Sequence, residues 1–232
     1  MLYWHETIKE KVIPLEKSPT MRQLQAQASK QKLRDIVFQM SKEKTLDDIR
    51  IKDICKEAGM SVGNFYLYFP SKESALIYSY KTKDDDWATL GLEEIADPLL
   101  RLCQMITIHL YSMTENSLCF DTQLYISQLK VYEDYFFTED RFLHRITRDA
   151  VSECQKSGLI KTKHSAYETA LRLLNFSRGL VYNYCIEHKE NHAEWLKYAI
   201  ECQQEYIQLF LTEEGLSRLE QESETLWLVP VK

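Results

Sequence analysis

The sequence predicts an all-α protein, and three observations support this. Glycine and proline, which disfavour helix interiors, number only six and five in 232 residues. Apolar residues recur at i, i+3, i+4 and i+7 along most of the chain, which is the spacing of one helix face. Serine, aspartate and glycine residues separate these segments at positions typical of helix caps. We therefore expect a succession of helices.

The first 19 residues, interrupted by Pro14 and Pro19, show no long apolar period and are interpreted as an extension. This extension is either disordered or packs locally through Tyr3 and Trp4. A first helix is predicted over about residues 23–44. Its apolar stripe consists of Leu33, Ile36, Val37 and Met40. The letters "TLDD" then predict a short turn.

Two short helices are predicted after this turn. The first has its apolar positions at Ile51, Ile54, Cys55 and Ala58. Gly59 follows, where a left-handed residue commonly ends a helix. Ser61 is suited to cap a second helix over residues 62–69, which Pro70 ends. Two short helices joined by a tight glycine turn after a longer helix form the outline of a helix-turn-helix.

The remainder of the chain is also predicted to be helical. Ser71 caps a helix that runs to about residue 87, with Glu73 in its first turn. Further helices are expected over about residues 98–113, 122–137, 139–157, 165–190 and 195–211, followed by a weaker tail over 215–232. The expected organisation is an extension (1–19), a helix-turn-helix domain (20–70) and a larger helical domain (71–232), in which 71–90 form a connecting helix.

Charge is distributed unevenly along the chain, whose overall net charge is −6. Residues 20–83 carry 12 Lys and Arg against 7 Asp and Glu, whereas residues 84–232 carry 14 against 25. A basic segment that coincides with a predicted helix-turn-helix indicates a nucleic-acid partner. Ordinary variation of surface charge is the alternative.

Several classes of protein are disfavoured. No stretch approaches the roughly 20 apolar residues of a membrane span, and no secretory signal is apparent. The six dispersed cysteines are interpreted as reduced thiols of a cytoplasmic protein. Cys185, His188 and His192 could share a helical face, but a predicted break between the two histidines argues against a metal site. No catalytic constellation or cofactor motif is found, so we expect neither an enzyme nor a bound cofactor.

One stretch carries a specific family motif: "IRIKDICKEAGMSVGNFYLYFPSKESAL". The positions that define it are Asp53, Ile54, Cys55, Ala58, Gly59, Met60, Ser61, Gly63, Tyr66, Tyr68, Phe69, Ser71, Lys72, Glu73 and Leu76. This pattern resembles the DNA-binding domain of TetR-family transcriptional regulators. The resemblance implies a three-helix helix-turn-helix head followed by a divergent helical domain for ligand binding and dimerisation.

The resemblance and the helical phase together predict the DNA-contacting residues. Phe65 and Phe69 lie four residues apart and are assigned to the core of the head. The residues expected to contact DNA are Arg50, Lys52, Ser61, Val62, Gly63, Asn64, Tyr66, Tyr68 and Lys72. Asn64 could pair with adenine or contact only water or phosphate. The resemblance gives Tyr66 and Lys72 phosphate contacts, while Arg50 replaces the usual Ser or Thr cap.

The resemblance also implies a small-molecule effector bound in the larger domain. This domain is rich in rings: Trp87, Tyr111, Phe120, Tyr125, Tyr132, Tyr135, Phe136, Phe142, Phe176 and Tyr182. Such rings fill a core or line an apolar pocket, so the effector is expected to be apolar or aromatic. The predicted ligand-binding residues are His109, Gln123, Tyr125, Asn175, Phe176 and Arg178. If Arg178 points inward, it favours an anionic or carbonyl-bearing ligand; otherwise it forms a surface or interface salt bridge.

The function predicted from the sequence is a sequence-specific repressor that an effector releases from a pseudo-palindromic double-stranded DNA operator. A homodimer is expected through the helices at about 165–188 and 193–211. The alternative is a DNA-binding nucleoid or cell-division protein of the same fold without ligand control. A filled core would favour that alternative.

Overall fold

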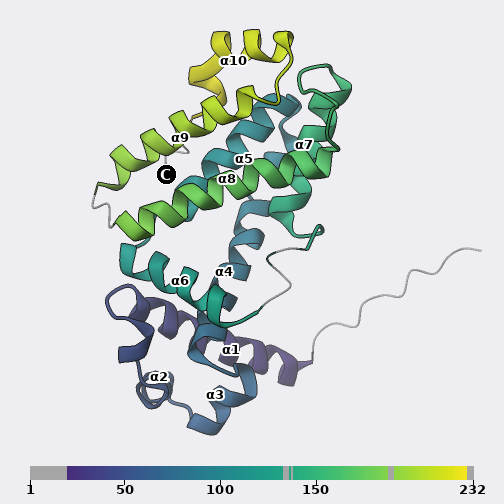
Figure 1. Cartoon of the computed structure of the whole chain (residues 1–232). Coiled ribbons are helices and arrows are strands. Elements are labelled where there is room, and N and C mark those ends of the chain that lie inside the picture. Colours follow the sequence, from purple (N-terminus) through teal and green to yellow (C-terminus); the bar gives the residue numbers. More distant parts are fainter. Residues whose placement is uncertain (1–19, 133–135, 137, 188–190, 229–232) are drawn as a thin grey trace, which may run out of the picture.

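The computed structural model describes residues 20–132, 136, 138–187 and 191–228. Within these residues the chain forms ten α-helices and two short 3-10 helices (Figure 1). The only extended pairing among them is an isolated antiparallel bridge between Ile160 and Leu211. The all-α prediction is therefore confirmed.

The first three helices form a small head at one end of the molecule (Figure 1). They are α1 (Met21–Ser41), α2 (Ile51–Ala58) and α3 (Val62–Tyr68), with the 3-10 helix η1 (Leu46–Asp48) between α1 and α2. Leu33, Val37, Leu46, Ile54, Phe65 and Phe69 are buried between them. The assignment of Phe65 and Phe69 to the core is confirmed.

Local signals fix the turn between α2 and α3. Gly59 has φ +68°, a left-handed conformation that glycine adopts without the steric cost of a Cβ. The Ser61 hydroxyl accepts a hydrogen bond from the Asn64 N–H at 3.2 Å and caps α3. Ser71 caps the next helix in the same way, through the Ser74 N–H at 3.1 Å. All three turn and cap predictions are confirmed.

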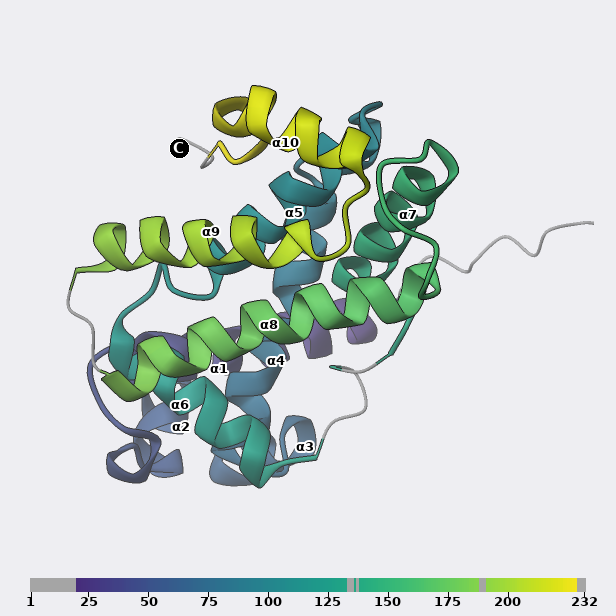
Figure 2. The same ribbon diagram turned by 45° about the horizontal axis from the view of Figure 1, so that its top comes forward.

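Helix α4 (Lys72–Ala88) leads from the head into the larger domain (Figure 1). Beyond it lie the 3-10 helix η2 (Leu92–Glu94) and α5 (Pro98–Ser112), α6 (Leu118–Lys130), α7 (Phe142–Lys156), α8 (Ala166–Glu187), α9 (His192–Gln208) and α10 (Glu213–Leu226). In both views α8 and α9 run side by side along one side of the domain (Figure 2). The predicted boundary between the two domains at residue 70 stays a prediction.

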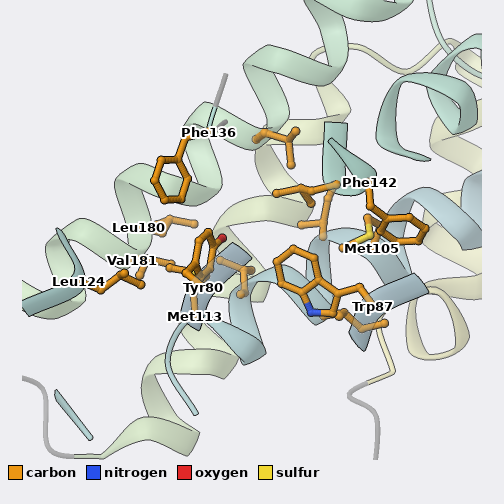
Figure 3. Close-up of a cluster of buried hydrophobic side chains, with 14 of the residues drawn as sticks. Tyr80, Trp87, Met105, Met113, Leu124, Phe136, Phe142, Leu180 and Val181 are labelled. Carbon is orange, nitrogen blue, oxygen red and sulfur yellow. The ribbon is translucent and has the colours of Figure 1, made fainter. Parts of the chain in front are cut away.

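The core of the larger domain surrounds the second half of α4. Figure 3 shows Tyr80 lying between Phe136 and Trp87. The Tyr80 and Phe136 rings stack with centroids 5.4 Å apart, and Trp87 meets Tyr80 edge-on at 6.3 Å. Apolar side chains from α5, α7 and α8 complete this cluster.

Helix α6 departs most from the sequence prediction. It begins at Leu118 rather than near residue 122, because Ser117 accepts a hydrogen bond from the Phe120 N–H and caps it. It ends at Lys130, well before the predicted residue 137. Two predicted pocket or core rings are instead exposed, Tyr132 at 82% and Tyr182 at 48%. The predictions for residues 1–19, Tyr135 and His188 concern residues outside those that the structure describes.

Candidate DNA-binding surface and effector cavity

The two faces of helix α3 differ in how far their side chains are exposed. Phe65 is fully buried, while Val62 (41% exposed), Tyr66 (55%) and Leu67 (78%) face outward. Asn64 is also exposed on this helix. The sequence analysis did not include Leu67 among the exposed residues of this helix. Leu67 lies midway between the buried Phe65 and Phe69, on the opposite face of the helix.

Three other predicted DNA contacts on α3 and its cap lie near this outward surface. Gly63 is exposed, and only the Ser61 hydroxyl would lie within 4 Å of a Cβ added there. Ser61 is exposed but its oxygen is already used in capping α3. Tyr68 is half-buried against the core of the head. The centre of this outward surface therefore consists of the apolar side chains of Val62 and Leu67 and the side-chain amide of Asn64.

Basic residues flank this surface at the start of α2. Arg50 and Lys52 are both exposed. Arg50 occupies the N-cap position but makes no side-chain cap hydrogen bond. The N-cap residue thus leaves the first N–H groups of α2 without its side chain as an acceptor, and such N–H groups can bind phosphate, although Asp53 adds a negative charge to the same turn.

Lys72 has a structural role that its motif position did not reveal. Its Nζ donates hydrogen bonds to the carbonyl oxygens of Leu46 and Ile49, the latter at 2.8 Å. These bonds tie the loop around η1 to the start of α4. An ammonium group has three donors, so one remains for a phosphate.

The helix α6 joins the larger domain to the head. The Leu46 N–H donates to Gln123 Oε1 at 3.1 Å, and the Ser117 hydroxyl donates to the Lys42 carbonyl at 2.6 Å. Phe120 meets Phe38 of α1 edge-on, with ring centroids 4.8 Å apart. Gln123, predicted as a ligand anchor, therefore lies at the junction between the domains and does not line the cavity described next.

A cavity of about 70 Å³ lies within the larger domain. It is lined by Tyr80, His109, Met113, Tyr125, Gln128, Phe136, Arg141 and Arg178. Three of the six predicted ligand-binding residues, His109, Tyr125 and Arg178, meet here. They come from α5, α6 and α8; α8 contacts both α5 and α6, and α6 packs against α4.

The other two predicted ligand-binding residues lie outside the lining. Asn175 is exposed, and its Oδ1 accepts a hydrogen bond from Arg178 Nη1 at 3.2 Å. Phe176 stacks on Tyr206 of α9 with ring centroids 4.2 Å apart. Asn175 thus helps to orient the arginine, and Phe176 contributes to the packing of α8 against α9.

The cavity is electropositive. Arg141 Nε donates to Asp84 Oδ2 at 2.7 Å, and both side chains are buried. Arg178 instead donates to His144 Nε2 at 2.8 Å and to the Phe136 carbonyl at 3.3 Å. Sequence reasoning missed Arg141 and His144, whose positions near the start of α7 carry no motif.

The two histidines here are held neutral. Burial and the guanidinium groups of Arg178 and Arg141 lower the pKa of His144 to about 4. Burial, Arg178 and Arg141 also hold the pKa of His109 well below its ordinary value. Neutral His144 can accept the hydrogen bond from Arg178 that the geometry requires.

A larger cleft of about 380 Å³ lies between the facing ends of α8 and α9. It is lined by Leu180, Asn183, Tyr184, Glu187, Asn191, Glu194, Trp195 and Tyr198. This cleft belongs to the pair of helices at which the sequence predicts a dimer. The smaller cavity around Tyr80 is therefore the candidate effector site.

Two further observations concern alternatives considered from the sequence. No group of three or more His, Cys, Asp or Glu residues in the described part of the chain is arranged to hold a metal ion. His192 contacts the Thr114 hydroxyl at 2.8 Å, and Cys185 is buried. None of the described helices is both long and apolar enough to cross a membrane.

The fold combines a helix-turn-helix head with a larger all-α domain. Residues 40–78 match the family model described as "Bacterial regulatory proteins, tetR family". The helix-turn-helix segment is therefore similar to the DNA-binding domain of TetR-family transcriptional regulators, which supports the resemblance seen in the sequence. Regulators of this family are DNA-binding proteins, typically repressors that respond to ligands, and are generally not enzymes.

Solved structures share the fold. The regulator FadR from Bacillus subtilis, in complex with stearoyl-CoA, is 19% identical over 75% of this chain and 96% of its own, with a TM-score of 0.53. RolR in complex with resorcinol is 11% identical over 90% of this chain and 97% of its own, with a TM-score of 0.60. A TetR transcription regulator from Haloarcula marismortui is 17% identical over 80% of this chain and 100% of its own, also with a TM-score of 0.60. Among curated proteins, no sequence matches this chain.

Proposed function

We propose that this chain is a homodimeric repressor that binds a pseudo-palindromic operator through α3 and is released by a small-molecule effector. The observation that carries the proposal is the outward face of α3. Val62, Asn64, Tyr66 and Leu67 are exposed on one short helix in the basic segment of an acidic protein. Exposed apolar and amide groups on such a helix suit the thymine methyl group and the adenine edge in the major groove.

The outward faces of α8 and α9 support a dimer. On α8 the exposed positions Asn175, Gly179, Tyr182 and Ile186 follow helical spacing. Tyr182 and Ile186 are about half exposed, and Tyr198 of α9 is 58% exposed. Large apolar side chains that gather on one face are typical of a protein interface. A two-fold axis there would present two α3 helices to half-sites roughly one DNA turn apart.

Two helices connect the cavity with the head. Helix α4 carries Tyr80 at the cavity and Lys72 at the loop around η1. Helix α6 carries Tyr125 and Gln128 at the cavity and Gln123 at the same loop. An effector that displaces either helix would therefore move the head. A coupling free energy of roughly 1–3 kcal/mol would change operator affinity about 5- to 150-fold.

The presence of a cavity with polar lining favours ligand control over the alternative, a DNA-binding protein of this fold without an effector. The relatives differ in ligand: the FadR structure holds stearoyl-CoA and the RolR structure resorcinol. Neither identity transfers at the sequence identities observed, so the effector must be inferred from this chain's own cavity.

DNA binding tests the proposal directly. Fluorescence anisotropy would compare the fragment upstream of the chain's own gene with a scrambled fragment over a range of salt concentrations. Asn64→Ala should lower affinity for the specific fragment by about 5- to 150-fold per half-site. Lys52→Ala should weaken both fragments and reduce the salt slope by about 1.8, because the dimer loses one phosphate contact at each half-site.

Lys163→Ala is the matched control, since Lys163 is exposed in the turn between α7 and α8. This variant should bind both fragments as the wild-type protein does. If the wild-type protein does not distinguish the upstream fragment from the scrambled one, the assignment of α3 as the reading helix for that operator is wrong.

A further inference from the structure

The side chain of Arg178 lines the cavity, and no carboxylate among the described residues pairs with it. Its three hydrogen bonds go to Asn175 Oδ1, the Phe136 carbonyl and His144 Nε2, all neutral acceptors. The neighbouring Arg141 differs, because Asp84 pairs with it at 2.7 Å. Within the part of the chain that the structure describes, a carboxylate therefore offsets the guanidinium group of Arg141 but not that of Arg178.

A second polar group in the cavity lacks a partner. His109 is 1% exposed, and its Nδ1 atom has no hydrogen-bond partner. Buried polar atoms are paired in most proteins. Arg178, whose described partners are all neutral, and His109 line the same space. A bound anion would accept hydrogen bonds from both.

The rest of the lining limits the charge and size of that anion. The single uncompensated arginine and the neutral His109 and His144 favour one negative charge rather than two. One water needs roughly 10–15 Å³ of such space. The volume of about 70 Å³ therefore holds about five or six non-hydrogen atoms.

Apolar groups occupy the opposite part of the lining. The stacked rings of Tyr80 and Phe136 and the side chain of Met113 form it. Figure 3 shows Tyr80, Phe136 and Met113 gathered in one cluster. These groups suit a short hydrocarbon chain, whereas a fully hydrated inorganic anion would gain nothing from them.

We propose that this cavity binds a short-chain aliphatic monocarboxylate, with its carboxylate on Arg178 and His109 and its hydrocarbon on Tyr80, Phe136 and Met113. The proposal rests on the effector-controlled function proposed above and names the chemical class of the effector. It excludes organic cations, which Arg141 and Arg178 would repel.

Thermal melting and titration calorimetry at constant ionic strength would test the proposal with the full-length protein. The probes are butyrate, its neutral isostere butyramide, and inorganic phosphate. Butyrate should raise the melting temperature of the wild-type protein, because a ligand that binds only the folded state stabilises it. Butyramide and phosphate should have little effect.

Single substitutions test whether butyrate binds at Arg178 and His109. Arg178→Met should bind butyrate about tenfold to a hundredfold more weakly, because the charged donor to the carboxylate is gone. Arg172→Met, an exposed position on the same helix, should bind butyrate as the wild-type protein does. His109→Leu keeps Arg178 and should lower the affinity for butyrate about tenfold. It provides a second test if Arg178→Met does not fold.

The proposal is overturned if butyramide or phosphate stabilises the protein as much as butyrate, or if Arg178→Met and His109→Leu bind butyrate with wild-type affinity. Operator binding is measured separately. If the wild-type protein binds its operator but not butyrate, only the chemical class of the effector is wrong. If it binds butyrate but no operator, the proposed repressor function is wrong while the carboxylate site stands.

Discussion

The hydrogen bond from the Leu46 N–H to Gln123 Oε1 makes a quantitative prediction about the junction between the two domains. Both residues are buried, at 1% and 9% exposure, and the bond is 3.1 Å long. Gln123→Met keeps the length of the side chain but removes the acceptor. A buried N–H left without a partner costs about 1–3 kcal/mol. Since each 1.4 kcal/mol is a factor of ten, opening at Leu46 should become roughly 5- to 150-fold more frequent.

Native-state hydrogen exchange followed by NMR measures this opening at the Leu46 amide itself. The exchange rate of Leu46 should rise by the factor above in Gln123→Met. Gln39→Met is the matched control, because Gln39 is exposed on α1. The Ser117 hydroxyl still donates to the Lys42 carbonyl in both variants, so the head should stay docked.

An unchanged Leu46 exchange rate in Gln123→Met would refute this reasoning, because protection of that amide would then come from the surrounding packing alone. A uniform rise across the whole head would also contradict it. That outcome would mean that the side chain supports the folding of the domain rather than this one contact.

Two further variants test packing and pH dependence. Gly215→Ala would place a Cβ 2.2 Å from the Leu159 carbonyl oxygen, so calorimetry should show a loss of about 1–3 kcal/mol or more, unlike Gly179→Ala, where no atom lies within 4 Å. His144, whose pKa falls to about 4 on folding, takes up a proton more readily in the unfolded state. Its contribution to stability is therefore complete above about pH 6.5 and is lost as the pH falls toward 4. Measured by urea denaturation, the free energy of unfolding of His144→Gln should fall less between pH 6.5 and pH 4 than that of the wild-type protein.

The helix-turn-helix could be predicted because its signals are local. Gly59, with φ +68°, and Ser61, which caps α3, lie within a few residues of the structure they determine. The four-residue spacing of Phe65 and Phe69 was sufficient to place both in the core. Such signals depend on backbone conformation and helical phase, which the neighbouring residues largely set.

The roles of two polar side chains could not be predicted, because their partners are distant in sequence. Lys72 binds the carbonyl of a residue 26 positions away, and Gln123 accepts from a backbone N–H 77 positions away. Both partners belong to the loop around η1. A long polar side chain has the same sequence signature whether it faces DNA, an effector or a backbone group, so only tertiary structure distinguishes these roles.

The charge of the cavity also depends on residues that are distant in sequence. The sequence left open whether Arg178 points inward or forms a salt bridge, and it gave no reason to consider Arg141. Asp84 of α4 neutralises Arg141, 57 positions away, and the partners of Arg178 among the described residues are all neutral. Had the fold placed Asp84 beside Arg178 instead, the same residues would line a cavity with a different anchor. The preference for an anion at Arg178 therefore depends on which arginine the fold pairs with Asp84, and not on the presence of either arginine in the sequence.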